Sequence, residues 1–130
     1  MVSNYVVVDS SFFLALYNID DSQHVDAVHA AEELTHHTLV VHPYVVQEVS
    51  TVLSYRFGTE VAKKFLSDVK NANNVLIPFV DVRRDIDYFV TNAGKKMSFT
   101  DLILVALAEN MNASLLTFDR QMLALFKKKT

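Results

Sequence analysis

The sequence predicts a single α/β domain with a central parallel β-sheet of about four strands, flanked by helices on both faces. Four short β-rich runs, YVVVD, TLVVH, NVLIP and SLLTF, alternate with longer helical segments, an order typical of parallel sheets. The first run holds three consecutive valines, which indicates a strand buried on both faces. With 130 residues, 51% of them hydrophobic, the chain is long enough for one core, so we expect one domain over residues 1–130.

The first half of the chain is expected to contain two strands and four helices. YVVVD predicts a strand at 5–9, and the apolar FFLAL predicts a helix at 11–18 directly after it. A helix at 23–35 precedes the β-rich TLVVH, which predicts a strand at 38–42. Apolar residues at three- and four-residue spacing in HPYVVQEVSTVL predict a helix at 43–57, and a further helix is expected at 59–71.

The second half repeats this alternation. NVLIP predicts a strand at 74–78, followed by a helix at 83–93. SFTDLILVALA predicts a helix at 99–111 that is apolar almost all the way round and should therefore be buried. SLLTF predicts a strand at 113–117, and RQMLALF predicts a helix at 119–127.

Composition excludes several classes of protein. The chain has no cysteine, which excludes disulfides and thiolate metal sites. Its longest wholly apolar run, LILVALA, is far too short to span a bilayer, and no signal-peptide pattern precedes the first strand. We therefore expect a cytoplasmic protein without a membrane contact. The net charge is −3, and without the three C-terminal lysines 9 basic residues face 15 acidic ones. Bulk charge would not attract nucleic acid, so nucleic-acid binding would need local basic groups and a metal.

Four acidic residues stand at positions that predict a common site. Asp9 ends the first strand, Asp119 follows the last, Asp101 opens the helix at 99–111, and Glu48 lies in the helix at 43–57. Each aspartate also has an ordinary structural interpretation, because Asp after a strand or in a first helical turn is a common cap. Glu48 has no such interpretation. We expect it on the core-facing stripe of its helix, where a charge needs a cation.

Carboxylates that converge without cations repel one another by several kcal/mol at close range. Mg²⁺ or Mn²⁺ would relieve this repulsion, because both ions prefer oxygen ligands and bind through a few carboxylates together with substrate phosphate. The chemistry usual for such a site is phosphodiester hydrolysis. The four acids therefore predict a divalent metal site at the carboxyl end of the sheet.

The order and context of these acids resemble those of the PIN domain, the nuclease fold of VapC-type toxins in toxin–antitoxin pairs. Asp9-Ser10-Ser11 resembles the first motif of the family, and PYVVQEVSTVL resembles the segment that carries the second acid, here Glu48. SFTDLILVALAENMNASLLTFD resembles the segment with the third and fourth acids, Asp101 and Asp119. The resemblance covers nearly the whole chain.

The resemblance implies a metal-dependent endoribonuclease. In the family, such acids bind Mg²⁺ or Mn²⁺ and cleave RNA, so Asp9, Glu48, Asp101 and Asp119 would be both metal ligands and catalytic residues. Ser11 and Thr117 would supply supporting hydroxyls. A small antitoxin protein and a homodimer are the expected partners. Many relatives continue into an edge strand after the last helix, whereas this sequence stops at FKKKT, so that strand should be missing or very short.

Three alternatives stay open at this point. A haloacid-dehalogenase-type phosphotransferase also has Asp at the end of its first strand, but it needs a second Asp where Ser11 stands. A non-catalytic or RNA-processing PIN-like module without an antitoxin would share the fold. A zinc site is disfavoured, because His24 and His29 are five residues apart and no H-E-x-x-H motif occurs.

Basic and aromatic residues give further predictions. Lys95, Lys96 and Arg120 each lie close in sequence to one of the four acids, and we predict that they contact RNA phosphates. The aromatic residues Phe12, Phe13 and Tyr17 are most simply core residues, but helices this apolar could also form part of a dimer interface.

Overall fold

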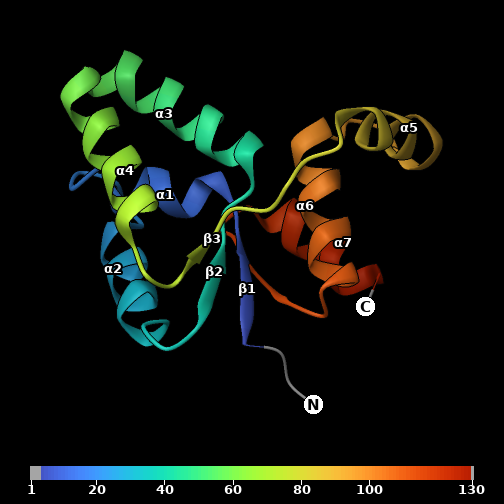
Figure 1. Cartoon of the computed structure of the whole chain (residues 1–130), viewed down its shortest axis with the longest axis horizontal. Coiled ribbons are helices and arrows are strands. Elements are labelled where there is room, and N and C mark those ends of the chain that lie inside the picture. Colours follow the sequence, from blue (N-terminus) through green and yellow to red (C-terminus); the bar gives the residue numbers. More distant parts are fainter. Residues whose placement is uncertain (1–3, 130) are drawn as a thin grey trace.

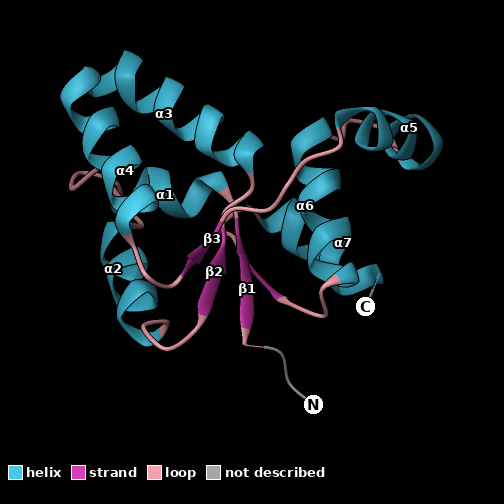
Figure 2. Cartoon of the chain, in the orientation of Figure 1, coloured by secondary structure: helices cyan, strands magenta, loops and turns pink. Residues whose placement is uncertain are grey.

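The computed structural model describes residues 4–129. Four parallel strands form one sheet in the order β3-β2-β1-β4 (Figures 1 and 2). They are β1 (Tyr5–Val8), β2 (Thr38–Val40), β3 (Val75–Leu76) and β4 (Ser114–Leu116). In the register of the sheet, Val7 of the central strand β1 pairs with Val40 on one side and Leu115 on the other. The predicted fold class is thereby confirmed.

In the described part of the chain, seven helices cover the sheet: α1 (Ser10–Leu16), α2 (His24–Glu33), α3 (Pro43–Phe57), α4 (Thr59–Asn71), α5 (Val82–Asn92), α6 (Phe99–Asn110) and α7 (Arg120–Lys129). The strand order runs outward from β1 to β3 and then returns to β4 on the other side of β1. Because crossover connections between parallel strands are right-handed, this reversal puts the later helices on the opposite face. In Figure 1, α1–α4 accordingly lie on one side of the sheet and α5–α7 on the other.

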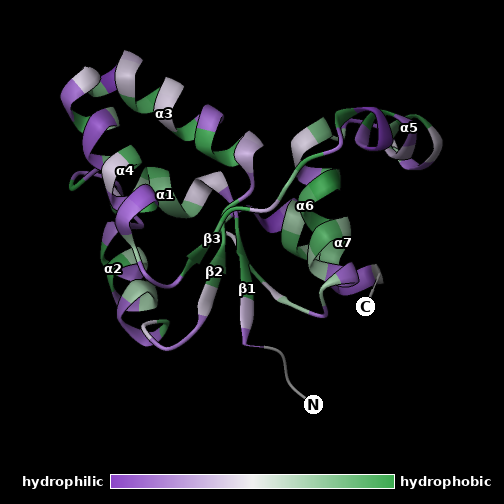
Figure 3. Ribbon diagram, in the orientation of Figure 1, coloured by the Kyte–Doolittle hydropathy of each residue, from purple (hydrophilic) through white to green (hydrophobic). Residues whose placement is uncertain are grey.

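The core lies where the central strand meets these helices. Val7, Val8 and Val40 are fully buried, as the valine-rich first run predicted. The hydropathy-coloured ribbon of Figure 3 shows the apolar colour concentrated in the strands and in α6. In α6, Leu102, Ile103, Leu104, Val105 and Ala108 are all buried, so the prediction of a buried helix is correct.

The helices begin and end within two residues of their predicted positions, but all four strands are shorter than predicted, and β3 differs most. β2 ends at Val40 because His42 already caps α3. β3 has two residues in place of five, because it is an edge strand paired with β2 alone, and Pro78 has no N–H to continue the ladder. Within the described residues, no strand follows α7.

The exposed apolar surface does not lie on the first helix. Phe12 and Phe13 are buried in the core, and Tyr17 is half-buried with its hydroxyl donating to Asp68 at 2.6 Å. Phe12 and Phe13 are therefore not available for a dimer interface, whereas for Tyr17 the suggestion stays a prediction. Exposed apolar side chains instead follow the edge of β3 and one stripe of α5, at Phe79, Val82, Ile86 and Val90. None of the helices within residues 4–129 combines the length and hydrophobicity required to span a bilayer.

Candidate active site

The candidate site lies at the carboxyl ends of β1 and β4. Asp9 follows β1 directly, and its N–H donates to the carbonyl of Leu116 on β4 at 2.9 Å. Thr117 and Asp119 follow β4, so both strand ends deliver polar side chains to one place. The strand order reverses between these two strands, and in open α/β sheets ligands bind at such a switch point.

The Asp9 carboxylate is buried and is held by two hydroxyls. Ser11 Oγ and Thr117 Oγ1 each donate to Asp9 Oδ2 at 2.8 Å. The hydroxyl oxygens in turn accept backbone N–H groups, from Phe118 to Ser11 and from Asp119 to Thr117, both at 2.9 Å. Each hydroxyl has one hydrogen, and both hydrogens are used on Asp9. Thr117, which lies 108 positions after Asp9 and 106 after Ser11, is thus held at the same carboxylate oxygen as Ser11.

This network leaves one oxygen of Asp9 for another partner. Among residues 4–129, every hydrogen bond to the carboxylate ends on Oδ2, including a long contact of 3.5 Å from the N–H of Ser11. Asp9 is the N-cap residue of α1, but the short bonds come from side chains and not from the helix. Capping alone therefore does not account for the two hydroxyls gathered at this position.

Ser11→Ala tests how much this network contributes to stability. The substitution removes the hydroxyl that donates to Asp9 and leaves the N–H of Phe118 without its acceptor. We expect a loss of about 1–2 kcal/mol in the free energy of unfolding, measured by urea denaturation. Ser50→Ala is the matched control, because the Ser50 hydroxyl makes one exposed bond to Gln47. Equal effects of the two substitutions would contradict the assigned role of Ser11.

Asp119 caps α7. Its Oδ1 accepts the N–H groups of Gln121 and Met122 at 2.9 and 3.1 Å, and the side chain is exposed. A capping carboxylate still has a second oxygen available. The structural interpretation of Asp119 is therefore correct, and it does not conflict with a role in the site.

Asp101 carries the clearest electrostatic signature of the four acids. It lies in the first turn of α6, where its N–H donates to the N-cap Ser98 at 3.0 Å. The pKa of Asp101 is raised to about 6, chiefly by burial and then by the negative charges of Asp9, Asp119 and Glu48, while hydrogen bonding with Ser98 opposes the rise. Charges from three separate parts of the chain therefore act on one carboxyl group.

The expectation that Glu48 lies on the core-facing stripe of its helix is wrong. The buried residues of α3 are Val45, Val49 and Leu53, whereas Glu48 is exposed. Adjacent residues in a helix are about 100° apart, so Glu48 points to one side of the stripe centred on Val49. That direction still faces the site, because the Glu48 charge contributes to the raised pKa of Asp101.

The donor chemistry of the four acids fits a hard divalent cation. Carboxylate oxygens are the ligands that Mg²⁺ and Mn²⁺ prefer, and a cation between them would relieve the repulsion that acts on Asp101. In the part of the chain that the structure describes, no three acidic or histidine side chains have the geometry to hold a metal ion as they stand. Binding a cation would require side-chain rotations that bring the carboxylates together.

The predicted phosphate contacts have different surroundings. Lys95 and Lys96 line a cavity of about 280 Å³ together with Asp101, between the start of α6 and one face of α7. Arg120 is exposed at the start of α7, directly after Asp119, and is not part of that lining.

A second polar cluster lies on the other side of α6, and its contacts could not be predicted from the sequence. His42 is buried and caps α3, and its Nδ1 accepts the N–H of Tyr44 at 3.0 Å. Burial lowers the pKa of His42. The Tyr44 hydroxyl donates to Asp85 of α5 at 2.7 Å. These residues belong to elements far apart in the chain, so only the position of α5 could have revealed the contact.

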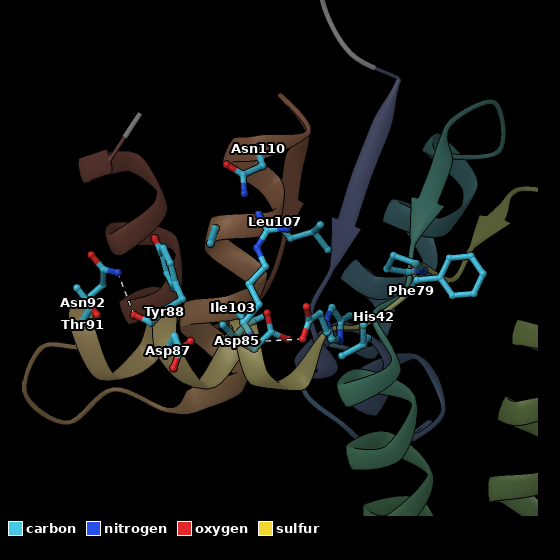
Figure 4. Close-up of a pocket in the computed structure, with 15 residues that line it drawn as sticks. His42, Phe79, Asp85, Asp87, Tyr88, Thr91, Asn92, Ile103, Leu107 and Asn110 are labelled. Atoms are coloured by element: carbon cyan, nitrogen blue, oxygen red, sulfur yellow. Dashed lines mark hydrogen bonds between the residues drawn. The ribbon is translucent and has the colours of Figure 1, made fainter.

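His42 and Asp85 line a cavity of about 490 Å³ between α5, α6 and the loop before α5. In Figure 4, Asp85, Asp87 and Tyr88 project from α5, Ile103 and Leu107 from α6, and Phe79 points away from the cavity. Ile103 and Asp101 are two residues apart on α6, about 200° around the helix. The larger cavity is therefore separate from the four acids.

Comparison with known proteins gives the family. The sequence model of the PIN domain matches residues 6–128. The chain belongs to the PIN domain family. The crystal structure of VapC20 from Mycobacterium tuberculosis, described as a sarcin-ricin loop cleaving toxin, is similar to this PIN domain with a TM-score of 0.78. The two are 22% identical, over 92% of this chain and 94% of that chain.

At this identity the likeness to VapC20 concerns the fold. No curated protein matched the sequence of this PIN domain. The family nevertheless decides against the haloacid-dehalogenase alternative, and the structure agrees at the residue that distinguishes the two families. Ser11 stands where the second Asp would be needed, and its hydroxyl donates to Asp9.

Proposed function

We propose that this PIN domain is a ribonuclease whose activity depends on Mg²⁺ or Mn²⁺ held by Asp9, Glu48, Asp101 and Asp119. The observation that supports this most strongly is the raised pKa of Asp101, which burial and the three other carboxylates cause together. These charges gather at the switch point of the sheet, where the chain also commits two hydroxyls to orient Asp9. A fold shared with an RNA-cleaving toxin points in the same direction.

Each residue has a distinct part in the proposed reaction. When bound, the divalent cation supplies charge for the phosphate and lowers the pKa of water for attack on it. Ser11 and Thr117 hold Oδ2 of Asp9, so that Oδ1 keeps a fixed direction. Asp101 must be ionised to act as a ligand, so the site should weaken as the pH falls below about 6. Lys95, Lys96 and Arg120 would contact RNA phosphates.

The test of this function is cleavage of RNA by the purified protein. Total cellular RNA and a set of short single-stranded RNAs would be incubated with the wild type and Mn²⁺, and separately with a chelator. We expect cleavage that requires the metal and returns when Mn²⁺ is added back. Binding of RNA without cleavage in either buffer would instead favour the non-catalytic PIN-like module.

We propose further that the enzyme is the toxin of a toxin–antitoxin pair. The acidic site would attract a basic side chain from a small antitoxin, which would offset the same repulsion that acts on Asp101. The protein encoded by the neighbouring gene would be co-expressed with a tagged copy of this chain and tested for co-purification and inhibition. If no neighbouring gene product binds the chain or inhibits its activity, a housekeeping RNA-processing role becomes the better assignment.

A homodimer is the last part of this proposal. Val82, Ile86 and Val90 are four residues apart on α5 and form an exposed apolar stripe. The stripe continues at Phe79, and burial of such a surface in a symmetric pair would remove it from water. We expect Ile86→Glu to shift the molecular mass in light scattering from dimer to monomer. Tyr55→Glu on α3, also an exposed site, is the control. A wild type that is monomeric at tens of micromolar would contradict the dimer.

A further inference from the structure

The cavity beside Asp101 has features that the proposed function does not yet use. Its volume is about 280 Å³, and its walls come from the segment before α6 and from α7. This volume lies just below the range of about 300–1,000 Å³ typical of small-molecule sites, so the space could take at most one nucleotide and not a duplex. Among the described residues, Asp101 is the acidic residue that lines it, which places the cavity directly against the candidate metal ligands.

Three lysines surround this cavity: Lys95 and Lys96 from the segment before α6, and Lys128 from α7. All three are exposed, and within residues 4–129 none of them takes part in a described ion pair. The chain carries a net charge of −3, so three lysines without a described ion pair around one cavity form a local basic patch on an acidic protein. Lysine ammonium groups are common ligands of phosphate. We call this site the lysine pocket.

The backbone conformation of Lys96 is a second feature of the lysine pocket that is typical of binding sites. Its φ is 53°, in the left-handed region that residues other than glycine rarely adopt. Such a conformation costs free energy and persists where the surrounding structure requires it, often at binding sites. Here the turn presents Lys95 and Lys96 to the cavity just before Ser98, the N-cap of α6.

Much of the remaining wall of the lysine pocket is apolar, with Ser98 and Gln121 as its uncharged polar members. Met97 lies in the segment just before α6, and Met122, Ala124 and Leu125 lie on α7. Methionine and leucine side chains give a surface on which the flat face of a base can rest, without selecting one base by hydrogen bonds. The cations on one wall match the phosphate of a nucleotide, and the apolar groups on the other match its base.

We propose that the lysine pocket binds one nucleotide of single-stranded RNA next to the scissile bond. Lys95, Lys96 and Lys128 would contact its phosphate, and Met97 and Leu125 would contact its base. This inference rests on the proposed ribonuclease function and adds Lys128, a residue from the last helix, to the substrate contacts. In this arrangement Asp119 caps the same helix, α7, that carries Lys128, so the position of α7 links a site acid to a phosphate contact.

The test measures RNA binding in a protein that cannot cut. Asp9→Asn would be titrated with a fluorescein-labelled 12-nucleotide poly(U) RNA in chelator, at several NaCl concentrations. Each phosphate contact on a single strand contributes about 0.7 to the slope of log K against log salt. Replacing Lys95, Lys96 and Lys128 with Gln removes the contacts to one phosphate, and should therefore reduce the magnitude of that slope by about 0.7 and weaken binding at low salt at least tenfold.

The matched control replaces Lys63, Lys64 and Lys70 of α4 with Gln. This changes the net charge by the same amount on a helix that Figure 1 shows on the other side of the sheet from α7. The control should keep the parental slope and affinity. Equal slopes for the two triple variants would overturn the lysine pocket.

A cleavage assay separates this inference from the function on which it rests. If the wild type cleaves RNA with Mn²⁺ but the two triple variants bind RNA equally, the pocket alone is wrong. If the wild type does not cleave RNA in any metal, the proposed function fails first. Circular dichroism of each variant establishes that the fold is intact.

Discussion

Asp9→Asn should lose at least roughly 100-fold in kcat/KM for RNA cleavage while the domain stays folded. This loss corresponds to about 2.7 kcal/mol of transition-state stabilisation. The change removes the charge of a buried carboxylate but keeps its shape and its acceptor oxygen, so the hydroxyls of Ser11 and Thr117 retain a partner. The measurement is cleavage of a short labelled RNA with saturating Mn²⁺.

The control for Asp9→Asn is Asp26→Asn, the same chemical change at an exposed position of α2. It should cleave RNA at the wild-type rate. Circular dichroism and thermal melts would establish that both variants are folded. Cleavage by Asp9→Asn at the wild-type rate would remove Asp9 from the catalytic site and return it to the role of a helix cap.

Asp101→Asn should stabilise the metal-free protein at pH 7.5, which is opposite to the usual effect of changing a half-buried residue. The folded-state pKa of Asp101 is raised to about 6 from an ordinary value of 3.8. A raised carboxyl pKa means that the ionised form destabilises the fold, fully above pH 6 and not at all below about pH 4. After an allowance for partial solvent screening and for the lost helix-dipole interaction, we expect a gain of about 1 kcal/mol, or roughly 3–5 °C in Tm.

The same variant should respond weakly to metal. Mn²⁺ at a hundredfold excess over Kd should stabilise the wild type by about 2.7 kcal/mol, because the ion binds only the folded state. Thermal melts of both proteins at pH 7.5 and pH 4, with chelator and with millimolar Mn²⁺, give all the comparisons. A simple capping role predicts a different pattern. In that case Asp101→Ala would lose about 1 kcal/mol and metal would have no effect.

The sequence alone predicted the sheet and its helices because each strand is a short β-rich run between longer helical segments. Asp9, Asp101 and Asp119 could be assigned to one end of the sheet for the same reason, since parallel strands bring their carboxyl ends together. The direction of Glu48 was harder to predict. Helical periodicity put it beside Val49, but a shift of one residue around the helix separates a buried side chain from an exposed one.

Contacts between distant elements could not be predicted from local patterns. The bond from Tyr44 to Asp85 depends on where α5 packs, and α5 has no buried residue that would fix this position in advance. The lysine pocket likewise brings Lys128 beside residues more than thirty positions earlier in the chain. Hydrophobic periodicity identifies a helix and its inner face, whereas the partner of a polar side chain depends on the tertiary fold.

The most direct test of the central claim is the binding of Mn²⁺ to the RNA-free protein, measured by isothermal titration calorimetry at pH 7.5. We expect saturable binding to the wild type, weaker binding at pH 5 because protons compete for Asp101, and at least tenfold weaker binding to Asp9→Asn and to Asp101→Asn at pH 7.5. Asp26→Asn should bind like the wild type. Equal isotherms for the wild type and the two site variants would contradict the claim that these carboxylates form a metal site.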